Sequence, residues 1–296
     1  MKKPLLFTGA ATAIITPFND DAGKTVNYDK LAELVEAQIT GGIDAIVVCG
    51  TTGEASTLTD EEHISVIKFV VKKTNSRVPV IAGVGSNDTR HAVELSQKAE
   101  QVGADGLLSV LPYYNKTSQA GLVEHYTIIA KSVKLPIIIY NVPTRTGCNI
   151  TPATLQKLAK LDNIVGVKEC NFSQVGDIVN LCGDDFAVYS GDDNVILPVL
   201  SLGGLGIISV MSNIIPNDVH DMVVKFLDCN LQGAKKIQLK TLPLINALFA
   251  DVSPMPLKAA MNILGKNVGT CRLPLVDVDP ALKTKLEEAL KNYGLI

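Results

Sequence analysis

The amino-acid sequence predicts an α/β protein built as a (β/α)8 TIM barrel with a C-terminal helical extension. Eight short apolar runs alternate with amphipathic stretches, and the runs are flanked by Gly, Pro, Asp and Asn. Continuous apolar runs of this length are typical of parallel strands buried on both faces. Eight is also the number of strands that closes such a barrel. The runs occupy residues 10–15, 45–49, 78–82, 106–111, 137–140, 164–168, 186–189 and 206–210.

Helix signals fill the gaps between these runs. Residues 31–39 carry apolar side chains on one helical face, as an amphipathic helix requires. Thr59 followed by Glu62 forms a capping box, and Thr151 before Pro152 places an N-cap ahead of a proline at the first helical position. Both pairs predict helices that begin directly after a loop.

The last part of the chain predicts helices without strands. No strand pattern follows residue 210, and helical spacing recurs at residues 216–229, 232–249, 256–264 and 280–292. We therefore expect a barrel over residues 1–224 and a helical extension over residues 225–296. An open doubly wound sheet is the alternative, but residues 83–88 lack the third glycine of its dinucleotide-binding fingerprint.

Composition and charge narrow the classes of partner. The 296 residues are 47% apolar and 19% charged, with a formal net charge of -3, so the chain suits a compact protein without a basic stripe for nucleic acid. No apolar stretch is long enough to span a membrane, and the N-terminus lacks a signal-peptide core, so we expect a cytoplasmic location. The histidines and cysteines show no metal-ligand spacing, so we expect neither a metal nor a cofactor.

Polar residues gather where the predicted strands end. In a (β/α)8 barrel the active site lies at the C-terminal ends of the strands, so these segments should meet on one rim. They are Gly-Thr-Thr-Gly-Glu at 50–54, Pro-Tyr-Tyr-Asn at 112–115, Tyr-Asn-Val-Pro-Thr-Arg-Thr-Gly at 140–147, Val-Lys-Glu at 167–169 and Ser-Gly-Asp-Asp at 190–193.

Lys168 ends an otherwise apolar run and is the candidate nucleophile. A lysine with an ordinary pKa near 10.4 is neutral in only about one molecule in a thousand at about pH 7.4. Burial lowers the pKa of catalytic lysines to about 7 to 8, which frees the amine to attack the keto group of a 2-oxo acid. The alternative is a lysine that extends to solvent and pairs with Glu169.

Tyr140 ends the preceding strand and is expected beside Lys168. Attack of an amine on a ketone and the loss of water that follows both need a proton shuttle, which a phenol can supply. Thr51 and Tyr114 are candidates to relay that proton to solvent. The alternative for Tyr140 is a half-buried tyrosine whose hydroxyl is satisfied by a structural hydrogen bond.

Two further groups are suited to carboxylates. The amides and hydroxyls of residues 50–54 lie on a strand-to-helix turn, where they can hold a carboxylate or simply stabilise the turn. Arg145 lies in a loop above the barrel and can clamp a second carboxylate, or it can form a surface ion pair. The glycines of residues 203–206 are interpreted as a tight turn rather than a phosphate loop.

The four motifs at 50–54, 112–115, 140–147 and 167–169 stand in an order and spacing that closely resemble the dihydrodipicolinate synthase family, and the similarity extends over nearly the whole chain. The resemblance implies a lyase of the class I aldolase type that condenses pyruvate with L-aspartate 4-semialdehyde in diaminopimelate and lysine biosynthesis. It implies that Lys168 forms the Schiff base and Tyr140 exchanges the proton. Thr51 and Tyr114 complete the relay, with Tyr114 supplied by a partner subunit.

The resemblance also implies how the substrates are held. Thr52 and the backbone at Ile208 bind the pyruvate carboxylate, and Arg145 faces the semialdehyde. Members of the family usually form homotetramers arranged as dimers of dimers. Because Asp60 and His91 replace residues that bind the inhibitor lysine in feedback-regulated members, we expect weak or absent inhibition by lysine.

Two other functions are compatible with these residues. Another pyruvate-dependent aldolase, such as N-acetylneuraminate lyase or a 2-keto-3-deoxy-sugar-acid aldolase, shares the lysine and the tyrosine. Thr51, Thr52 and the segment 144–146 favour the synthase, because Arg145 offers a cation where a sugar needs hydroxyl partners. The second alternative is a barrel that binds a 2-oxo acid as a sensor without catalysis. Measuring whether the protein consumes pyruvate distinguishes such a sensor from an enzyme.

Overall fold

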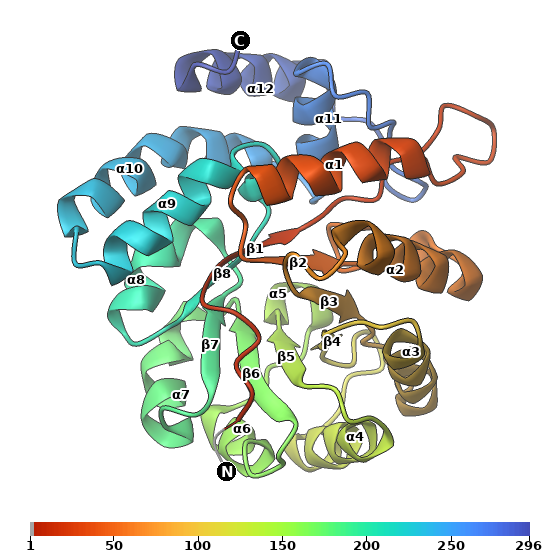
Figure 1. The fold of residues 1–296 in the computed structure, drawn as a ribbon, viewed down its shortest axis with the longest axis vertical. Helices are drawn as coiled ribbons and strands as arrows, with labels where there is room; N and C mark the ends of the chain where they lie inside the picture. The colour runs from red at the N-terminus through yellow and green to blue at the C-terminus, as the bar shows by residue number, and fades with distance from the viewer. Residues whose placement is uncertain (1–2) are drawn as a thin grey trace.

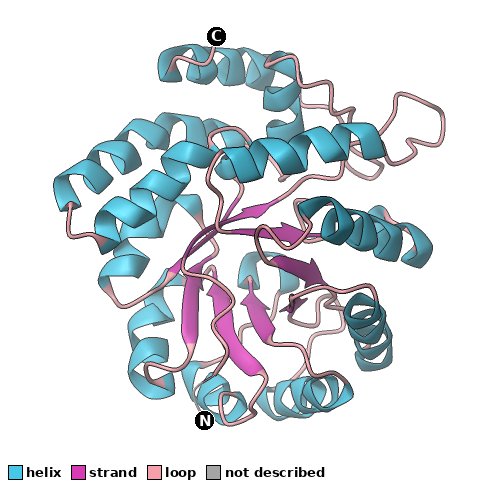
Figure 2. Cartoon of the chain, viewed as in Figure 1, coloured by secondary structure: helices cyan, strands magenta, loops and turns pink. Residues whose placement is uncertain are grey.

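The computed structural model describes residues 3–296 and contains a closed barrel of eight parallel strands, each paired with the next in sequence and β8 paired with β1. Figure 1 shows the strands around a common centre, and Figure 2 shows the surrounding layer of helices. The predicted fold class is therefore confirmed, with strand ends displaced by at most two residues from the predicted runs. The strands are β1 Gly9–Ala13, β2 Ala45–Val48, β3 Val80–Gly83, β4 Gly106–Val110, β5 Ile137–Asn141, β6 Ile164–Glu169, β7 Ala187–Ser190 and β8 Gly206–Ser209.

The helices begin where the sequence places their caps. Thr59 and Glu62 form the predicted capping box of α2, and the Thr151 side chain accepts a hydrogen bond from the Thr154 backbone N–H at the start of α6. The barrel helices are α1 Tyr28–Thr40, α2 Asp60–Thr74, α3 Thr89–Gln101, α4 Gln119–Ser132, α6 Pro152–Leu158, α7 Val175–Cys182, α8 Ile196–Ser201 and α9 Pro216–Leu227. Short helical turns in the loops are η1 Ala55–Thr57, α5 Pro143–Thr146, η2 Phe172–Gln174, η3 Asp193–Val195 and η4 Met211–Asn213.

Three helices follow the barrel, namely α10 Leu231–Leu248, α11 Met255–Ile263 and α12 Pro280–Tyr293. The helix α10 packs on α9 and on α12, and α11 packs on α12. In Figure 1 these blue helices cover the side of the barrel next to α1 and α9. The division of the chain into residues 1–224 and 225–296 stays a prediction, and it passes through α9.

The strands separate two apolar cores. Inside the barrel, Ile138, Tyr140, Val165 and Tyr189 belong to one cluster of buried side chains, and Phe7 stacks on Tyr189 with ring centroids 4.2 Å apart. The larger cluster lies between the strands and the helices. A strand residue therefore contributes either to the interior, where the site lies, or to the layer behind it.

An irregularity in β6 determines which residues face the interior. Ile137 pairs with Ile164 but Ile138 pairs with Gly166, so β6 contains one extra residue relative to β5. A Cβ atom at Gly166 would lie 2.4 Å from the carbonyl oxygen of Ala187, so only glycine fits the close approach to β7. Beyond this bulge the side chain of Lys168 points inward and that of its neighbour points outward.

Candidate active site

A cavity of about 560 Å³ opens at the C-terminal ends of the barrel strands. Its lining comes from the segments that follow β2, β3, β4 and β5 and includes Thr51, Tyr140 and Arg145. This is the rim on which the sequence predicts the polar segments to meet, and it is where (β/α)8 enzymes place their chemistry.

Lys168 lies beside Tyr140 at this rim. The two residues are paired in register across β5 and β6, and the Lys168 Nζ atom is 4.4 Å from the centroid of the Tyr140 ring. The lysine is 5% exposed, and burial lowers its pKa, although Cys170 and Asp193 oppose the shift. An amine with a lowered pKa is neutral more often and is then able to attack a carbonyl carbon.

The alternative in which Lys168 pairs with Glu169 is not found. Within residues 3–296 no carboxylate lies within ion-pair distance of Lys168, and the Glu169 carboxylate is buried behind the strand among amide donors. When Lys168 is protonated, its buried ammonium group has no carboxylate partner. This environment favours the neutral amine.

Tyr140 is suited to hold a proton rather than to release it. Its side chain is 7% exposed, and burial raises the pKa of the phenol above its usual value, while hydrogen bonding with the Thr51 side chain lowers it again. Cys170, the residue that directly follows β6, also contacts this hydroxyl. The phenol is therefore neutral and carries a proton that it can donate to a nearby oxygen atom.

The turn at residues 50–54 closes tightly against the barrel. The Gly53 N–H donates to the Gly50 carbonyl oxygen at 3.1 Å, and the Thr16 hydroxyl donates to the Gly53 carbonyl oxygen at 2.7 Å. Thr52 is buried and Thr51 is exposed toward the cavity that it lines. The turn thus presents two hydroxyls with different access to solvent.

Ile208 lies on β8, which is separated from β2 by β1 and from β6 by β7. It is fully buried on β8 and pairs with Ala11 of β1. The segment that follows is held by Asp193, whose Oδ2 atom accepts hydrogen bonds from the Val210 N–H at 3.1 Å and the Met211 N–H at 3.0 Å. The sequence motif at 190–193 assigns Asp193 no role, and the one signal for it is its place in η3, directly after β7.

Arg145 and Tyr114 lie farther from the lysine. Arg145, on the short helix α5, is exposed at the cavity, and its Nη2 atom donates to the Ser253 carbonyl oxygen at 3.4 Å. Tyr114 is 90% exposed, has a backbone φ of 67° and does not line the cavity. One chain therefore brings Lys168, Tyr140 and Thr51 together and leaves Tyr114 outside.

Glu54, the last residue of the turn motif, points away from the cavity. Its Oε1 atom lies 2.5 Å from the Nζ atom of Lys258 in α11, and its Oε2 atom accepts a hydrogen bond from the Arg272 N–H at 2.9 Å. Both side chains of the ion pair are at most 2% exposed. Sequence reasoning gave Glu54 no role, because its partner lies in a distant part of the chain.

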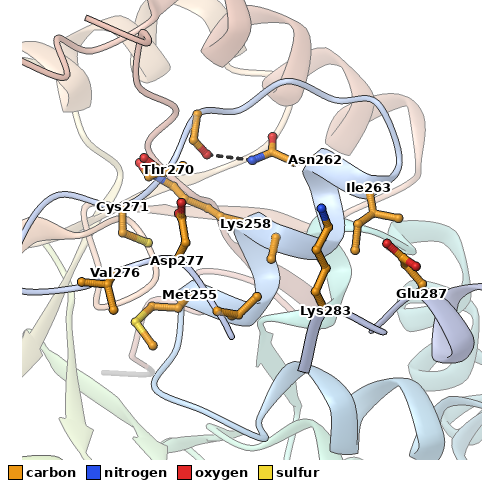
Figure 3. A pocket seen from close by; sticks show the side chains of 13 residues that line it. Met255, Lys258, Asn262, Ile263, Thr270, Cys271, Val276, Asp277, Lys283 and Glu287 are labelled. Atoms are coloured by element: carbon orange, nitrogen blue, oxygen red, sulfur yellow. Dashed lines mark hydrogen bonds between the residues drawn. The ribbon is translucent and has the colours of Figure 1, made fainter. Parts of the chain in front are cut away.

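Lys258 also lines a second cavity, of about 500 Å³, formed within the C-terminal extension. Figure 3 shows it between α11, the loop that carries Thr270 and Cys271, and the start of α12, with Lys283 and Glu287 at its edge. Asn262 closes one side by donating to the Gly269 carbonyl oxygen at 3.0 Å. This cavity lies apart from the residues that surround Lys168.

Asp60 and His91 meet at the far side of the barrel-mouth cavity. The His91 Nε2 atom is 3.1 Å from Asp60 Oδ1, and its Nδ1 atom is 3.1 Å from the Ser86 hydroxyl. His63 is buried nearby, with Nε2 at 2.7 Å from the Gly83 carbonyl oxygen. All three titratable side chains line the same cavity as Tyr140.

Residues 3–296 hold neither a candidate metal site nor a candidate membrane span. No group of three or more His, Cys, Asp or Glu side chains is placed to hold a metal ion. Over the same residues, no helix combines the length and the apolar character that crossing a membrane requires.

The closed barrel, with a buried lysine and a phenol at its mouth, defines the class of Schiff-base-forming (β/α)8 lyases. The chain belongs to the dihydrodipicolinate synthetase family, whose sequence model matches residues 6–293.

Individual relatives agree along their whole lengths. A 4-hydroxy-tetrahydrodipicolinate synthase of Acetivibrio thermocellus is 60% identical over 296 residues, which cover 100% of both chains. The crystal structure of dihydrodipicolinate synthase from Aquifex aeolicus superposes with a TM-score of 0.95 at 44% identity, covering 98% of this chain and 99% of that one. The enzyme from Cyanidioschyzon merolae, solved with lysine bound, gives a TM-score of 0.95 at 40% identity, covering 99% of this chain and 100% of that one.

Proposed function

We propose that this chain is a 4-hydroxy-tetrahydrodipicolinate synthase that condenses pyruvate with L-aspartate 4-semialdehyde through a Schiff base on Lys168, a step of diaminopimelate and lysine biosynthesis. The observation that carries the proposal is the buried amine of Lys168, 4.4 Å from the ring centroid of Tyr140 at the barrel mouth. The names of its full-length relatives give the reaction.

The chemistry needs a neutral amine and a mobile proton. The Lys168 amine adds to the keto carbon of pyruvate, and the resulting carbinolamine loses its hydroxyl as water to leave an imine. Loss of a proton from the pyruvate methyl group then gives an enamine, whose carbon attacks the aldehyde of the second substrate. Tyr140 supplies the proton for the departing hydroxyl, and Thr51 and Tyr114 return it from solvent.

Three groups orient the substrates in this proposal. The Thr52 hydroxyl and the backbone at Ile208 hold the pyruvate carboxylate, which fixes the keto carbon over Lys168. Arg145, exposed at the cavity, pairs with the carboxylate of the semialdehyde. A cation at this position favours an acidic aldehyde over the neutral sugars that other pyruvate aldolases accept.

We further propose that the active site is completed by a second copy of the chain. Tyr114 is 90% exposed and does not line the cavity of its own barrel mouth. A partner in a homotetramer built as a dimer of dimers would receive this ring. We place the enzyme in the cytoplasm, where amino-acid precursors are made.

Reductive trapping tests the assignment of the nucleophile. Borohydride added with pyruvate should fix a covalent adduct that peptide mapping places at residue 168, and Lys168→Ala should abolish it. Lys98→Ala, which removes an exposed lysine, is the matched control and should leave trapping unchanged. An adduct at another lysine, or preferred turnover of neutral sugar aldehydes in a substrate panel, would overturn the proposal.

A further inference from the structure

A buried carboxylate lies directly behind the lysine, on the outer face of β6. Glu169 is 1% exposed. Its Oε1 atom accepts hydrogen bonds from Asn141 Nδ2 at 2.8 Å and from the Asn171 N–H at 2.6 Å, and its Oε2 atom accepts one from Gln174 Nε2 at 2.8 Å. Three donors and no acceptor therefore surround this carboxylate.

The backbone fixes the orientation of the amide donors. Asn141 Oδ1 accepts from the Ile150 N–H at 3.3 Å, and Gln174 Nε2 also donates to the Ile150 carbonyl oxygen at 3.0 Å. Asn149 joins the two amides, because its Oδ1 atom accepts from Asn141 and its Nδ2 atom donates to Gln174. Reversing either amide would break these bonds, so both must turn N–H groups toward Glu169.

The cluster connects the two strands that carry the reacting groups. Asn141 follows Tyr140 on β5, Glu169 follows Lys168 on β6, and both pairs are in register. Neighbouring side chains on a strand point to opposite faces. The hydrogen bond from Asn141 to Glu169 therefore joins β5 and β6 on the outer face of the barrel, one residue beyond the pair of Tyr140 and Lys168 that faces the interior.

The ionised carboxylate is the form that matches three donors, because a protonated one would direct its own O–H at another donor. Burial raises the pKa of Glu169 to about 7, even though the hydrogen bonds from Asn171, Gln174 and Asn141 lower it. Of the titratable groups around it, Lys168 lies on its own strand and Cys170 directly follows that strand. The side chains that face it from β5, from η2 and from the loop at residues 147–151 are neutral amides.

We propose that ionised Glu169 is a positioning residue that locks β5 and β6 in register from behind and so holds the Lys168 amine against Tyr140. The inference rests on the proposed function, because it assigns Lys168 as the nucleophile. It extends that function because the reaction then also depends on the ionisation of Glu169, a group on the outer face of β6 that does not contact the substrate.

Two variants test the proposal. Glu169→Gln sets an amide N–H2 against the Gln174 N–H2, and it should slow both borohydride trapping of pyruvate and kcat by about tenfold to a hundredfold, as small misplacements of reacting groups do. The exchange Glu169→Gln/Gln174→Glu again places an acceptor opposite each donor of the cluster, and only the Ile150 carbonyl oxygen loses the donor that it has in the unmodified protein. It should recover most of the trapping rate. Glu288→Gln, an exposed change of the same chemistry, is the control.

The pH profile separates positioning from a merely structural role. The acidic limb of kcat in the unmodified enzyme should contain the ionisation of Lys168 and that of Glu169, and Glu169→Gln should lose the second. A Glu169→Gln enzyme that melts earlier but traps pyruvate at the normal rate with an unchanged profile would overturn the proposal. If Glu169→Gln does not fold, the exchange variant decides, and slow trapping in a stably folded exchange variant would overturn it. Failure of the proposed function looks different, because the unmodified enzyme would then form no adduct at residue 168.

Discussion

At the scale of single residues, the burial of Lys168 couples function to stability. Burial lowers the pKa of Lys168 from its ordinary 10.5, whereas the unfolded chain keeps the ordinary value. Between the two pKa values the unfolded state binds a proton that the folded state has released. Stability at this position therefore rises with pH across that window, and the cost of burial vanishes above about pH 10.5.

Lys168→Met should consequently stabilise the protein while it abolishes the reaction. The free energy of unfolding should increase at about pH 7 and should increase less at about pH 10, because at the higher pH the unfolded lysine is close to its own pKa and less of the cost of burying the charge remains. Denaturant unfolding at the two pH values measures the difference, with the exposed Lys98→Met as the control. An equal gain at both pH values would show that packing, rather than the ionisation, is responsible.

Asp60 and His91 carry a second prediction at this scale. Asp60 is already paired with His91 at 3.1 Å, so a lysine ammonium entering this part of the cavity would compete with the imidazole for the carboxylate. We expect no inhibition of the enzyme by lysine below about 1 mM. The exchange Asp60→His/His91→Glu moves the carboxylate to the other side of the pair, and it should make the enzyme more sensitive to lysine in a steady-state assay. Strong inhibition of the unmodified enzyme would contradict this expectation.

At the scale of elements, the eight apolar runs were sufficient to predict the barrel. Each strand is buried on both faces, so the runs mark the strands to within two residues, and the adjacency of Tyr140 and Lys168 follows from consecutive parallel strands. The sequence did not allow us to predict which side chains of β6 point into the barrel and which point outward. The bulge at Gly166 changes the phase of the alternation, and it depends on the approach of β7 rather than on any local pattern.

Gly166→Ala should therefore damage both the fold and the site. A Cβ atom would lie 2.4 Å from the Ala187 carbonyl oxygen, which forces β6 and β7 apart at about 1 to 3 kcal/mol of stability. The displacement should also turn Lys168 from Tyr140 and lower kcat more than it raises KM. Gly176→Ala on α7, where no atom lies within 4 Å of the added Cβ, is the control and should be neutral or slightly stabilising. A normal kcat in Gly166→Ala would show that the bulge is not needed to place Lys168 for the reaction.

At the scale of the whole molecule, the C-terminal extension is joined to the active-site turn through buried charge. The sequence shows helices after residue 210 and a turn at 50–54, but it gives no sign that Glu54 and Lys258 meet. Such a contact is set by how α11 docks on the barrel, which local patterns do not encode. Arg272 reinforces the connection by pairing with Glu62 at 2.6 Å at the start of α2.

The buried pair predicts a strong coupling between the extension and pyruvate binding. Lys258→Met leaves the Glu54 carboxylate buried without its cation, which should cost about 3 to 5 kcal/mol of unfolding free energy. Glu54→Gln/Lys258→Met removes both charges and keeps an acceptor for the Arg272 N–H, so it should cost less than Lys258→Met alone. Because Glu54 ends the turn that carries Thr51 and Thr52, the single variant should also raise KM for pyruvate.

Arg77→Met, which breaks an exposed pair with Glu36, is the control and should cost at most about 1 kcal/mol with KM unchanged. A Lys258→Met enzyme with reduced stability and an unaltered KM for pyruvate would confine the extension to supporting the fold, whereas a raised KM that the double variant restores would give it a part in holding the substrate.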